Sequence, residues 1–192
     1  MIDVNVPMTE ADARALRLGD EVGLTGTLVT ARDAAHKYMT ARPRPWLKPI
    51  LKNRVIYHCG PVVKQQHGQW RFTAAGPTTS IREEPYQGQV IADYQVRGVI
   101  GKGGMGPATL RAMKEHGAVY LHAIGGAASL LARCVKRVAD VHMLDELGVP
   151  EAFWVIEVER FPVVVTMDSR GHSLHRNIER QSRQRLAELY GR

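Results

Sequence analysis

The sequence predicts an α/β fold with a mixed, partly parallel sheet and flanking helices. Strand-like runs rich in β-branched residues alternate with helical patterns through the middle of the chain, as at 22–29, 96–100 and 118–124. Glycine-rich turns follow several of these runs. With 192 residues the chain can bury one substantial core, so we expect a single domain over 1–192 with a basic, helical tail from about residue 176.

The N-terminal half carries start and stop signals for its elements. Thr9, with Asp12 three residues later, predicts a capped short helix before the strand at 22–29. Thr30 is then expected to cap a helix in which Asp33 takes the third position. The other elements expected here are apolar or β-branched segments bounded by turns: strands at 55–58, 62–63 and 69–74, and a helix that includes 90–94.

In the C-terminal half, proline and glycine residues mark where elements are expected to begin and end. Pro107 is a good first-turn residue and predicts a helix that stops at Gly117. The tail from Asn177 is arginine-rich and expected to be helical. The remaining expectations are segments between turns: a helix at 127–138 and strands at 154–158 and 163–167.

Charge and composition favour a protein that binds an anion. The formal net charge is +7, which suits nucleic acid, acidic lipid, or small carboxylates and phosphates. No apolar stretch is long enough to span a bilayer, and the N-terminus Met-Ile-Asp-Val-Asn does not look like a signal peptide. We therefore expect a cytoplasmic protein that does not bind a membrane.

The two cysteines, Cys59 and Cys134, are far apart and lack CxxC spacing. Two cysteines cannot hold an iron–sulfur cluster by themselves. The histidines have no metal-ligand partners at useful spacing either, so the sequence predicts no metal site in this chain.

The most informative segment is Gly-Lys-Gly-Gly-Met-Gly-Pro at 101–107, between a strand-like run and a helical pattern. It satisfies G-x-G-x-x-G, but the next strand ends without the carboxylate that a dinucleotide-binding site needs. It also resembles the GxxG loop of RNA-binding KH modules, although Gly106 and Pro107 interrupt the expected helix. The third hypothesis is an anion-binding turn, because glycine N–H groups and Lys102 face a helix N-terminus.

Three further junctions carry similar chemistry. Thr-Ala-Arg-Asp at 30–33 places Arg32 at a helix start, the segment 76–82 combines a glycine turn with three hydroxyls and Arg82, and Gly-Gly at 125–126 enters another helix. Arginines, a lysine, hydroxyls and free helix N–H groups together suit a small molecule with two carboxylates.

These motifs, taken in order, resemble the β subunit, or C-terminal domain, of class I (iron–sulfur) fumarate hydratase and the related L-tartrate dehydratase. The resemblance runs from about residue 9 to about residue 175 and leaves the arginine-rich tail outside. The matching positions are 30–33 with His36, 60–61, 76–80 with Arg82, 101–106, 125–127, 144–148 with 150–151, and the late Asp168 and Gly171.

The resemblance implies a swivelling β/β/α domain that closes over a partner α subunit. That partner would carry a [4Fe-4S] cluster on three cysteines of its own, in an α2β2 hetero-oligomer. The implied activity is a hydro-lyase that reversibly hydrates fumarate to malate. Tartrate dehydration to oxaloacetate and mesaconate hydration are the alternatives within this class, and a KH-like RNA-binding protein is the alternative outside it.

The resemblance also implies roles for individual residues. Arg82 and Lys102 would bind substrate carboxylate, with Thr79, Gly101 and Gly103 completing the binding loops.

Thr78 would be the base at the carbon that loses or gains a proton, with Arg32 beside it. Asp33 and His36 lie three apart and would orient Arg32 from behind. An ordinary helix-capping aspartate and a polar histidine are the alternative. His58 and Cys59 are expected to pack rather than border the site.

One position departs from the family pattern, which usually has methionine directly after the arginine matched to Arg82. Here Glu83 and Glu84 follow. A new carboxylate near the site is expected to change substrate preference or to pair with a cation.

Overall fold

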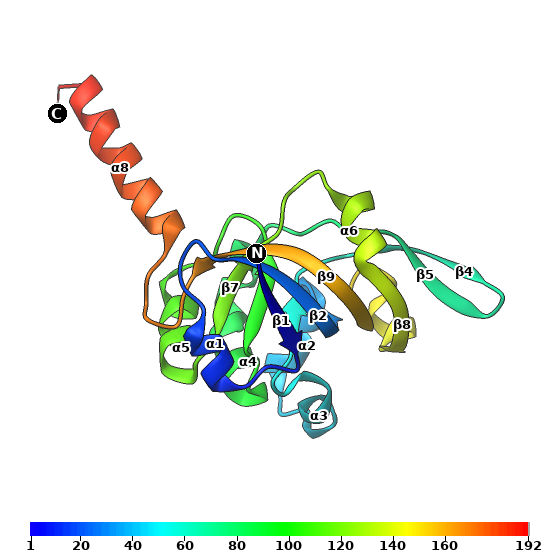
Figure 1. The fold of residues 1–192 in the computed structure, drawn as a ribbon. Coiled ribbons are helices and arrows are strands. Elements are labelled where there is room, and N and C mark those ends of the chain that lie inside the picture. Colours follow the sequence, from blue (N-terminus) through cyan, green and yellow to red (C-terminus); the bar gives the residue numbers. More distant parts are fainter. Residues whose placement is uncertain (192) are drawn as a thin grey trace.

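The computed structural model describes residues 1–191 and shows a mixed sheet with helices packed against it (Figure 1). The strands are β1 (Ile2–Val6), β2 (Glu21–Thr30), β3 (Val55–Tyr57), β4 (Val62–Gln66), β5 (Gln69–Ala74), β6 (Gly98–Gly101), β7 (Val119–His122), β8 (Val135–His142) and β9 (Phe153–Met167). The helices are α1 (Glu10–Ala15), α2 (Asp33–Ala41), α3 (Lys48–Leu51), α4 (Glu84–Tyr94), α5 (Pro107–His116), α6 (Ala128–Cys134), α7 (Leu144–Leu147) and α8 (Leu174–Leu189), with 3-10 turns η1 (Pro45–Leu47) and η2 (Ser80–Glu83).

The main sheet has the order β1-β2-β3-β6-β7-β9-β8. Strands β1, β2, β3, β6 and β7 run parallel, whereas β9 is antiparallel to its neighbours. The long strand β9 also pairs with β2, so β2, β3, β6, β7 and β9 form a closed ring of strands. The expected swivelling-type β/β/α fold with a mixed, partly parallel sheet is confirmed.

Two hydrophobic clusters lie on opposite faces of the parallel strands, because side chains alternate along a strand. Leu28 and Tyr57 belong to the cluster that also contains Trp154, inside the ring of strands. Val29 and Ile56 belong to the second cluster, which packs against α2, α4 and α5. Strands β3 and β6 are buried along their whole length, as expected for parallel strands covered on both faces.

Several local predictions are confirmed. Thr9 and Asp12 form a capping box at the start of α1. Helix α5 begins at Pro107 and ends at Gly117, whose left-handed backbone (φ 65°) suits glycine. Strand β5 has the predicted bounds, and the arginine-rich tail forms α8, which projects away from the rest of the protein (Figure 1).

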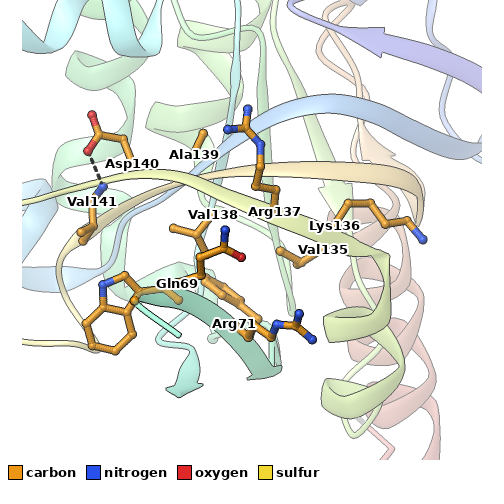
Figure 2. A pocket seen from close by; sticks show the side chains of 12 residues that line it. Gln69, Arg71, Val135, Lys136, Arg137, Val138, Ala139, Asp140 and Val141 are labelled. Atoms are coloured by element: carbon orange, nitrogen blue, oxygen red, sulfur yellow. Dashed lines mark hydrogen bonds between the residues drawn. The ribbon is translucent and has the colours of Figure 1, made fainter. Parts of the chain in front are cut away.

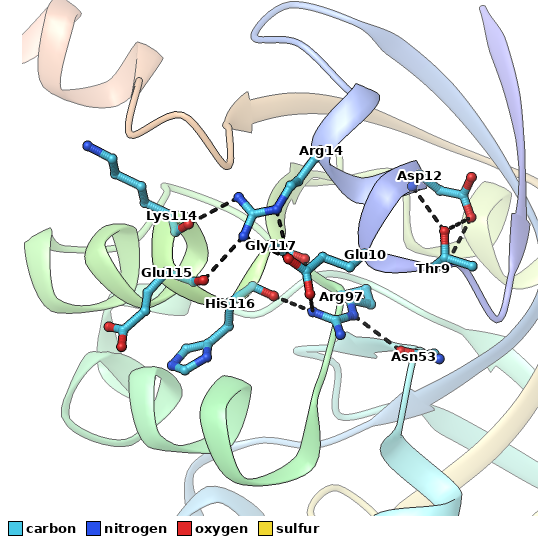
Figure 3. A network of polar contacts seen from close by, with 10 residues as sticks. All are labelled: Thr9, Glu10, Asp12, Arg14, Asn53, Arg97, Lys114, Glu115, His116 and Gly117. Atoms are coloured by element: carbon cyan, nitrogen blue, oxygen red, sulfur yellow. Dashed lines mark hydrogen bonds and ion pairs between the residues drawn. The ribbon is translucent and has the colours of Figure 1, made fainter.

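Helix α1 is fastened to the end of α5 by a polar network (Figure 3). Arg14 donates to the carbonyl oxygens of Lys114 and Glu115, each at 3.2 Å. Arg97 donates to the carbonyl oxygen of His116 and pairs with Glu10 at 3.5 Å. These contacts satisfy carbonyls that the end of a helix leaves without internal partners.

Four sequence predictions are wrong in the described residues. Strand β1 was not expected. Thr30 does not cap α2, because it is the last residue of β2. Its hydroxyl donates to Ala152 O (3.2 Å) and accepts from Trp154 N (3.1 Å), while Arg32 takes the cap position.

The predicted helix at 127–138 ends at Cys134, and its last four residues open β8, which pairs with β9. The two strands expected at 154–158 and 163–167 form one continuous strand, β9, in which Arg160 has a left-handed conformation (φ 47°).

No helix within residues 1–191 combines the length and apolar character needed to cross a membrane.

Candidate active site

Two of the predicted site residues follow the carboxyl ends of parallel strands, at one edge of the main sheet. Arg32 comes two residues after β2, and Lys102 directly follows β6. In closed rings of parallel strands, as in open parallel sheets, ligands bind at the carboxyl ends of the strands, because the loops that leave neighbouring strands converge there.

Backbone hydrogen bonds join the loop 78–82 to the ends of β3 and β6. Thr78 N donates to His58 O at 2.7 Å, and Lys102 N donates to Thr78 O at 3.1 Å. Ser80 N in turn donates to Lys102 O at 3.0 Å, so this segment runs parallel to the chain that carries Lys102. The hydroxyl-bearing loop and the lysine are therefore held side by side by the main chain.

The side chains of Arg82, Asp33 and Arg32 form one group at the other end of this loop. The Asp33 carboxylate accepts from Nε of Arg82 at 3.1 Å and from its Nη2. Nη2 of Arg32 lies 3.9 Å from the same carboxylate, and Nε of Arg32 lies 3.6 Å from Glu151 Oε1. Arg32 also lies directly over Gly60, where a Cβ would overlap its guanidinium.

Asp33 and His36 contact different parts of Arg32. The Asp33 carboxylate pairs with the guanidinium groups of Arg32 and Arg82. The ring of His36 is buried, with Nδ1 2.8 Å from Arg32 O and Nε2 2.8 Å from Gln87 Oε1. Asp33 is thus placed to orient both Arg32 and Arg82, and His36 supports only the backbone of Arg32.

A buried polar chain underlies the site, and apart from His36 its residues were not predicted as site residues. Tyr120 donates to Ser80 Oγ at 2.9 Å, and Ser80 Oγ lies 2.8 Å from Nδ1 of His58. Nε2 of His58 lies 2.9 Å from the Gln87 oxygen that also contacts His36. All five residues are fully buried. Polar side chains inside otherwise apolar segments were the only sequence signal for them.

Burial keeps the two histidines neutral. It lowers the pKa of His36, and together with the neighbouring His36 it lowers the pKa of His58 well below its usual value. His58, expected to pack, is therefore a packed residue that also supports the hydroxyl of Ser80.

The glycines of the segment 101–106 have distinct local roles. Gly101 is buried, and a Cβ there would overlap Ser80 Oγ. Gly103 is exposed and left-handed (φ 81°), which lets the chain turn after Lys102. Gly125 lies against the same lysine, since its Cβ would be 3.7 Å from Lys102 Cδ. Thr78 is half-buried and Thr79 is exposed.

The two glutamates that depart from the family pattern have different environments. Glu84 accepts hydrogen bonds from Gly106 N (2.8 Å), Ala108 N (2.9 Å) and Thr109 N (3.2 Å), which caps α5. Glu83 is fully buried, and its two carboxyl oxygens have no hydrogen-bond partner among residues 1–191. Burial and the negative charge of Asp33 raise the pKa of Glu83 to about 7, against the opposing effect of the nearby arginines.

The cysteines of this chain do not fit an iron–sulfur cluster. Cys59 is fully buried, and burial raises the pKa of its thiol to about 12, which disfavours the thiolate that binds metal. Cys134 lies on α6 and is partly exposed. In the described part of the chain, no three His, Cys, Asp or Glu side chains are grouped to hold a metal ion.

A separate groove of about 610 Å³ lies between β5 and β8 (Figure 2). Its lining includes Trp70, Arg71, Arg137 and Val138, and none of the predicted site residues. The cationic and hydroxyl groups at the sheet edge, not this groove, therefore define the candidate active site.

Comparison with known proteins identifies the family of this chain. The family model described as Fumarase C-terminus matches residues 1–178. A protein of Geobacillus stearothermophilus, provisionally named a class I fumarate hydratase, is 50% identical over 190 residues, 98% of this chain and 36% of the relative. This chain thus spans about a third of that relative's length.

Two relatives resemble this chain over most of their own length. A Methanocaldococcus jannaschii protein, provisionally named an L(+)-tartrate dehydratase subunit beta, is 40% identical over 187 residues, 96% of each chain. The L(+)-tartrate dehydratase subunit beta of Escherichia coli (strain K12) is 37% identical over 172 residues, 89% of this chain and 85% of the relative. With the family model matched across residues 1–178, the chain belongs to the fumarase C-terminal domain family.

Proposed function

We propose that this chain is the β subunit of a hydro-lyase that reversibly hydrates fumarate to malate. It would act with an α subunit that carries the [4Fe-4S] cluster, in an α2β2 assembly in the cytoplasm. The observation that carries the proposal is the grouping of Arg32, Arg82 and Lys102 with a hydroxyl-bearing loop at one sheet edge. The subunit-beta names of two relatives support the need for a partner chain.

In this proposal the chain binds and orients a dianion. Arg82 presents a planar guanidinium suited to a carboxylate, and Asp33 holds it in place. Lys102 supplies a second cation, and Gly103 and Thr79 bring main-chain groups close to the ligand.

Thr78 is the proposed base. In the direction of dehydration, Oγ1 as the alkoxide would take the proton from the substrate carbon and become a hydroxyl, while the C–O bond on the adjacent carbon breaks and its hydroxyl leaves; in hydration the hydroxyl would return the proton to carbon. A threonine hydroxyl is a weak base in water, so the role requires a closed, dry site and a nearby cation such as Arg32 to stabilise the alkoxide.

Tartrate dehydration is the second candidate, and mesaconate hydration the third. The names of the two relatives that align over most of their own length favour tartrate, whereas the name of the relative with 50% identity favours fumarate. An RNA-binding role is disfavoured, since the family match extends far beyond the glycine loop.

The test is to co-express the chain with its partner subunit without oxygen and to assay fumarate, tartrate and mesaconate. Lys102→Ala and Arg82→Ala should each reduce kcat/KM by about 100-fold or more, the cost of removing a charged hydrogen bond to a buried anion. Lys64→Ala and Arg111→Ala, at exposed positions outside the site, are the matched controls. Full activity in either site variant, or no activity toward all three substrates in the wild type, would overturn the proposal.

A further inference from the structure

The carboxyl of Glu83 is the least expected feature of the site. It belongs to η2, directly after Arg82, and none of its surface is exposed. Neither of its oxygens has a hydrogen-bond partner within residues 1–191. A buried carboxylate without a partner is costly, whereas the neutral acid at the same place costs much less.

The groups that face Glu83 come from three elements. Asp33 and Arg32 lie at the start of α2, Arg82 lies in η2 itself, and Tyr120 lies on β7. Asp33 disfavours a second negative charge, while the two arginines favour it. Arg82 is hydrogen-bonded to Asp33, and Arg32 lies 3.9 Å from Asp33 and 3.6 Å from Glu151 with no hydrogen bond from its Nε to any of the described residues, so the arginines are shared between several carboxyl groups.

The charges around the site are closely balanced. Arg32, Arg82 and Lys102 supply three positive charges, and Asp33 and Glu151 supply two negative ones. One net positive charge remains to attract a dianion. An ionised Glu83 would cancel it and would also compete with the substrate for the arginines.

We propose that Glu83 is a positioning residue that sets the affinity of the site for a dicarboxylate. When Glu83 is the neutral acid, Arg32 and Arg82 are available to bind Asp33 and the substrate. When Glu83 is ionised, it attracts the two arginines and weakens substrate binding. This rests on the proposed function, and it adds a control of affinity through a residue that does not touch the substrate. By linkage, a bound dianion also favours the protonated form of Glu83.

The consequence is a pH-dependent KM. Glu83 changes charge near neutral pH, since burial and Asp33 raise its pKa to about 7. The carboxyls of fumarate stay ionised at this pH, so they do not contribute. KM for fumarate should rise about tenfold between pH 6 and pH 8, with little change in kcat, if only the protonated form binds well.

The experiment compares wild type, Glu83→Gln and Glu115→Gln in the two-subunit enzyme. Glu83→Gln should keep the low KM at pH 8 and show no rise, whereas Glu115→Gln, at an exposed position on α5, should follow the wild type. A wild-type KM that is flat from pH 6 to pH 8, or a rise that persists in Glu83→Gln, would overturn the inference. An enzyme inactive toward all dicarboxylates would instead overturn the proposed function.

A second measurement does not depend on activity or on the folding of a variant. Carbon-13 NMR of the glutamate side chains in the isolated wild-type chain should show one carboxyl that titrates near neutral pH. Where Glu83→Gln folds, that signal should be missing from its spectrum. If all glutamates of the wild-type chain titrate near their ordinary pKa, Glu83 is ionised throughout and the inference fails.

Discussion

Glu84 allows a direct test of how the loop 101–106 is held. Its carboxylate accepts from three backbone N–H groups at the start of α5 and from the hydroxyl of Thr109 at 2.6 Å. The cap residue of α5 is Gly106, which has no side chain to satisfy these donors. We therefore expect Glu84→Ala to leave the first turn of α5 without its cap.

The size of the effect follows from the geometry. A lost cap costs about 1–2 kcal/mol, and the loss of a negative charge at a partly buried helix N-terminus adds up to about 2 kcal/mol. We expect Glu84→Ala to lower the free energy of unfolding by about 3 kcal/mol and the Tm by about 6–12 °C. Glu84→Gln, which keeps one acceptor oxygen, should lose about half as much.

Urea unfolding followed by circular dichroism measures this difference. Glu115→Ala is the control, because Glu115 is exposed near the other end of the same helix and should change stability by about 0.5 kcal/mol or less. If Glu84→Ala unfolds within about 0.5 kcal/mol of wild type, the carboxylate does not cap α5 and the assignment of Glu84 to structure is refuted.

Three further predictions concern stability. Glu83→Gln should remove a contribution that lowers stability by roughly 3 kcal/mol between pH 4.5 and 7, because the folded acid keeps a proton that the unfolded chain has lost; the difference in unfolding free energy between the two proteins, measured with urea at pH 5 and pH 8, checks this, and a difference that does not change with pH would contradict it. Gly101→Ala should destabilise the chain by about 2 kcal/mol or more, since its Cβ would displace Ser80, and a Tm equal to wild type would show that the loop adapts. A chain that ends at Asn177 should keep its Tm within about 2 °C, because the α8 side chains beyond that point are exposed, and a larger loss would reveal a stabilising role for this helix.

Local signals predicted the elements that depend on neighbours in sequence. The capping box of Thr9 and Asp12 and the Pro107 to Gly117 helix were found because the residues that start and stop a helix lie within a few positions of each other. The prediction of a helix at 135–138 was wrong because the structure of this segment depends on a strand that is distant in sequence. The apolar spacing of 135–138 fits a helix or a strand, and pairing with β9, distant in sequence, decides for the strand.

The location of the site could be predicted from local sequence signals, but the contacts between its residues could not. Glycine turns, hydroxyls and cations at strand ends indicated where an anion would bind. The pairing of Arg82 with Asp33, 49 positions away, could not be found from sequence spacing. The different environments of Glu83 and Glu84 could not be predicted either. Successive residues of a helical turn point about 100° apart, so one carboxyl is buried in the interior and the other lies at the start of α5.

The buried polar chain and Glu83 together shape how stability depends on pH. His36 and His58 are held neutral, so the unfolded chain binds more protons than the folded chain below about pH 6.5, and stability rises with pH up to that point. Glu83 has the opposite sign, because its raised pKa makes stability fall as pH rises toward 7. The two effects oppose each other through the pH range in which the histidines of the unfolded chain titrate, so Glu83 makes the stability of the wild type fall relative to that of Glu83→Gln as pH rises toward 7. Without the carboxyl, as in Glu83→Gln, the histidines act alone, and stability should rise with pH and then level off once the histidines of the unfolded chain have lost their protons.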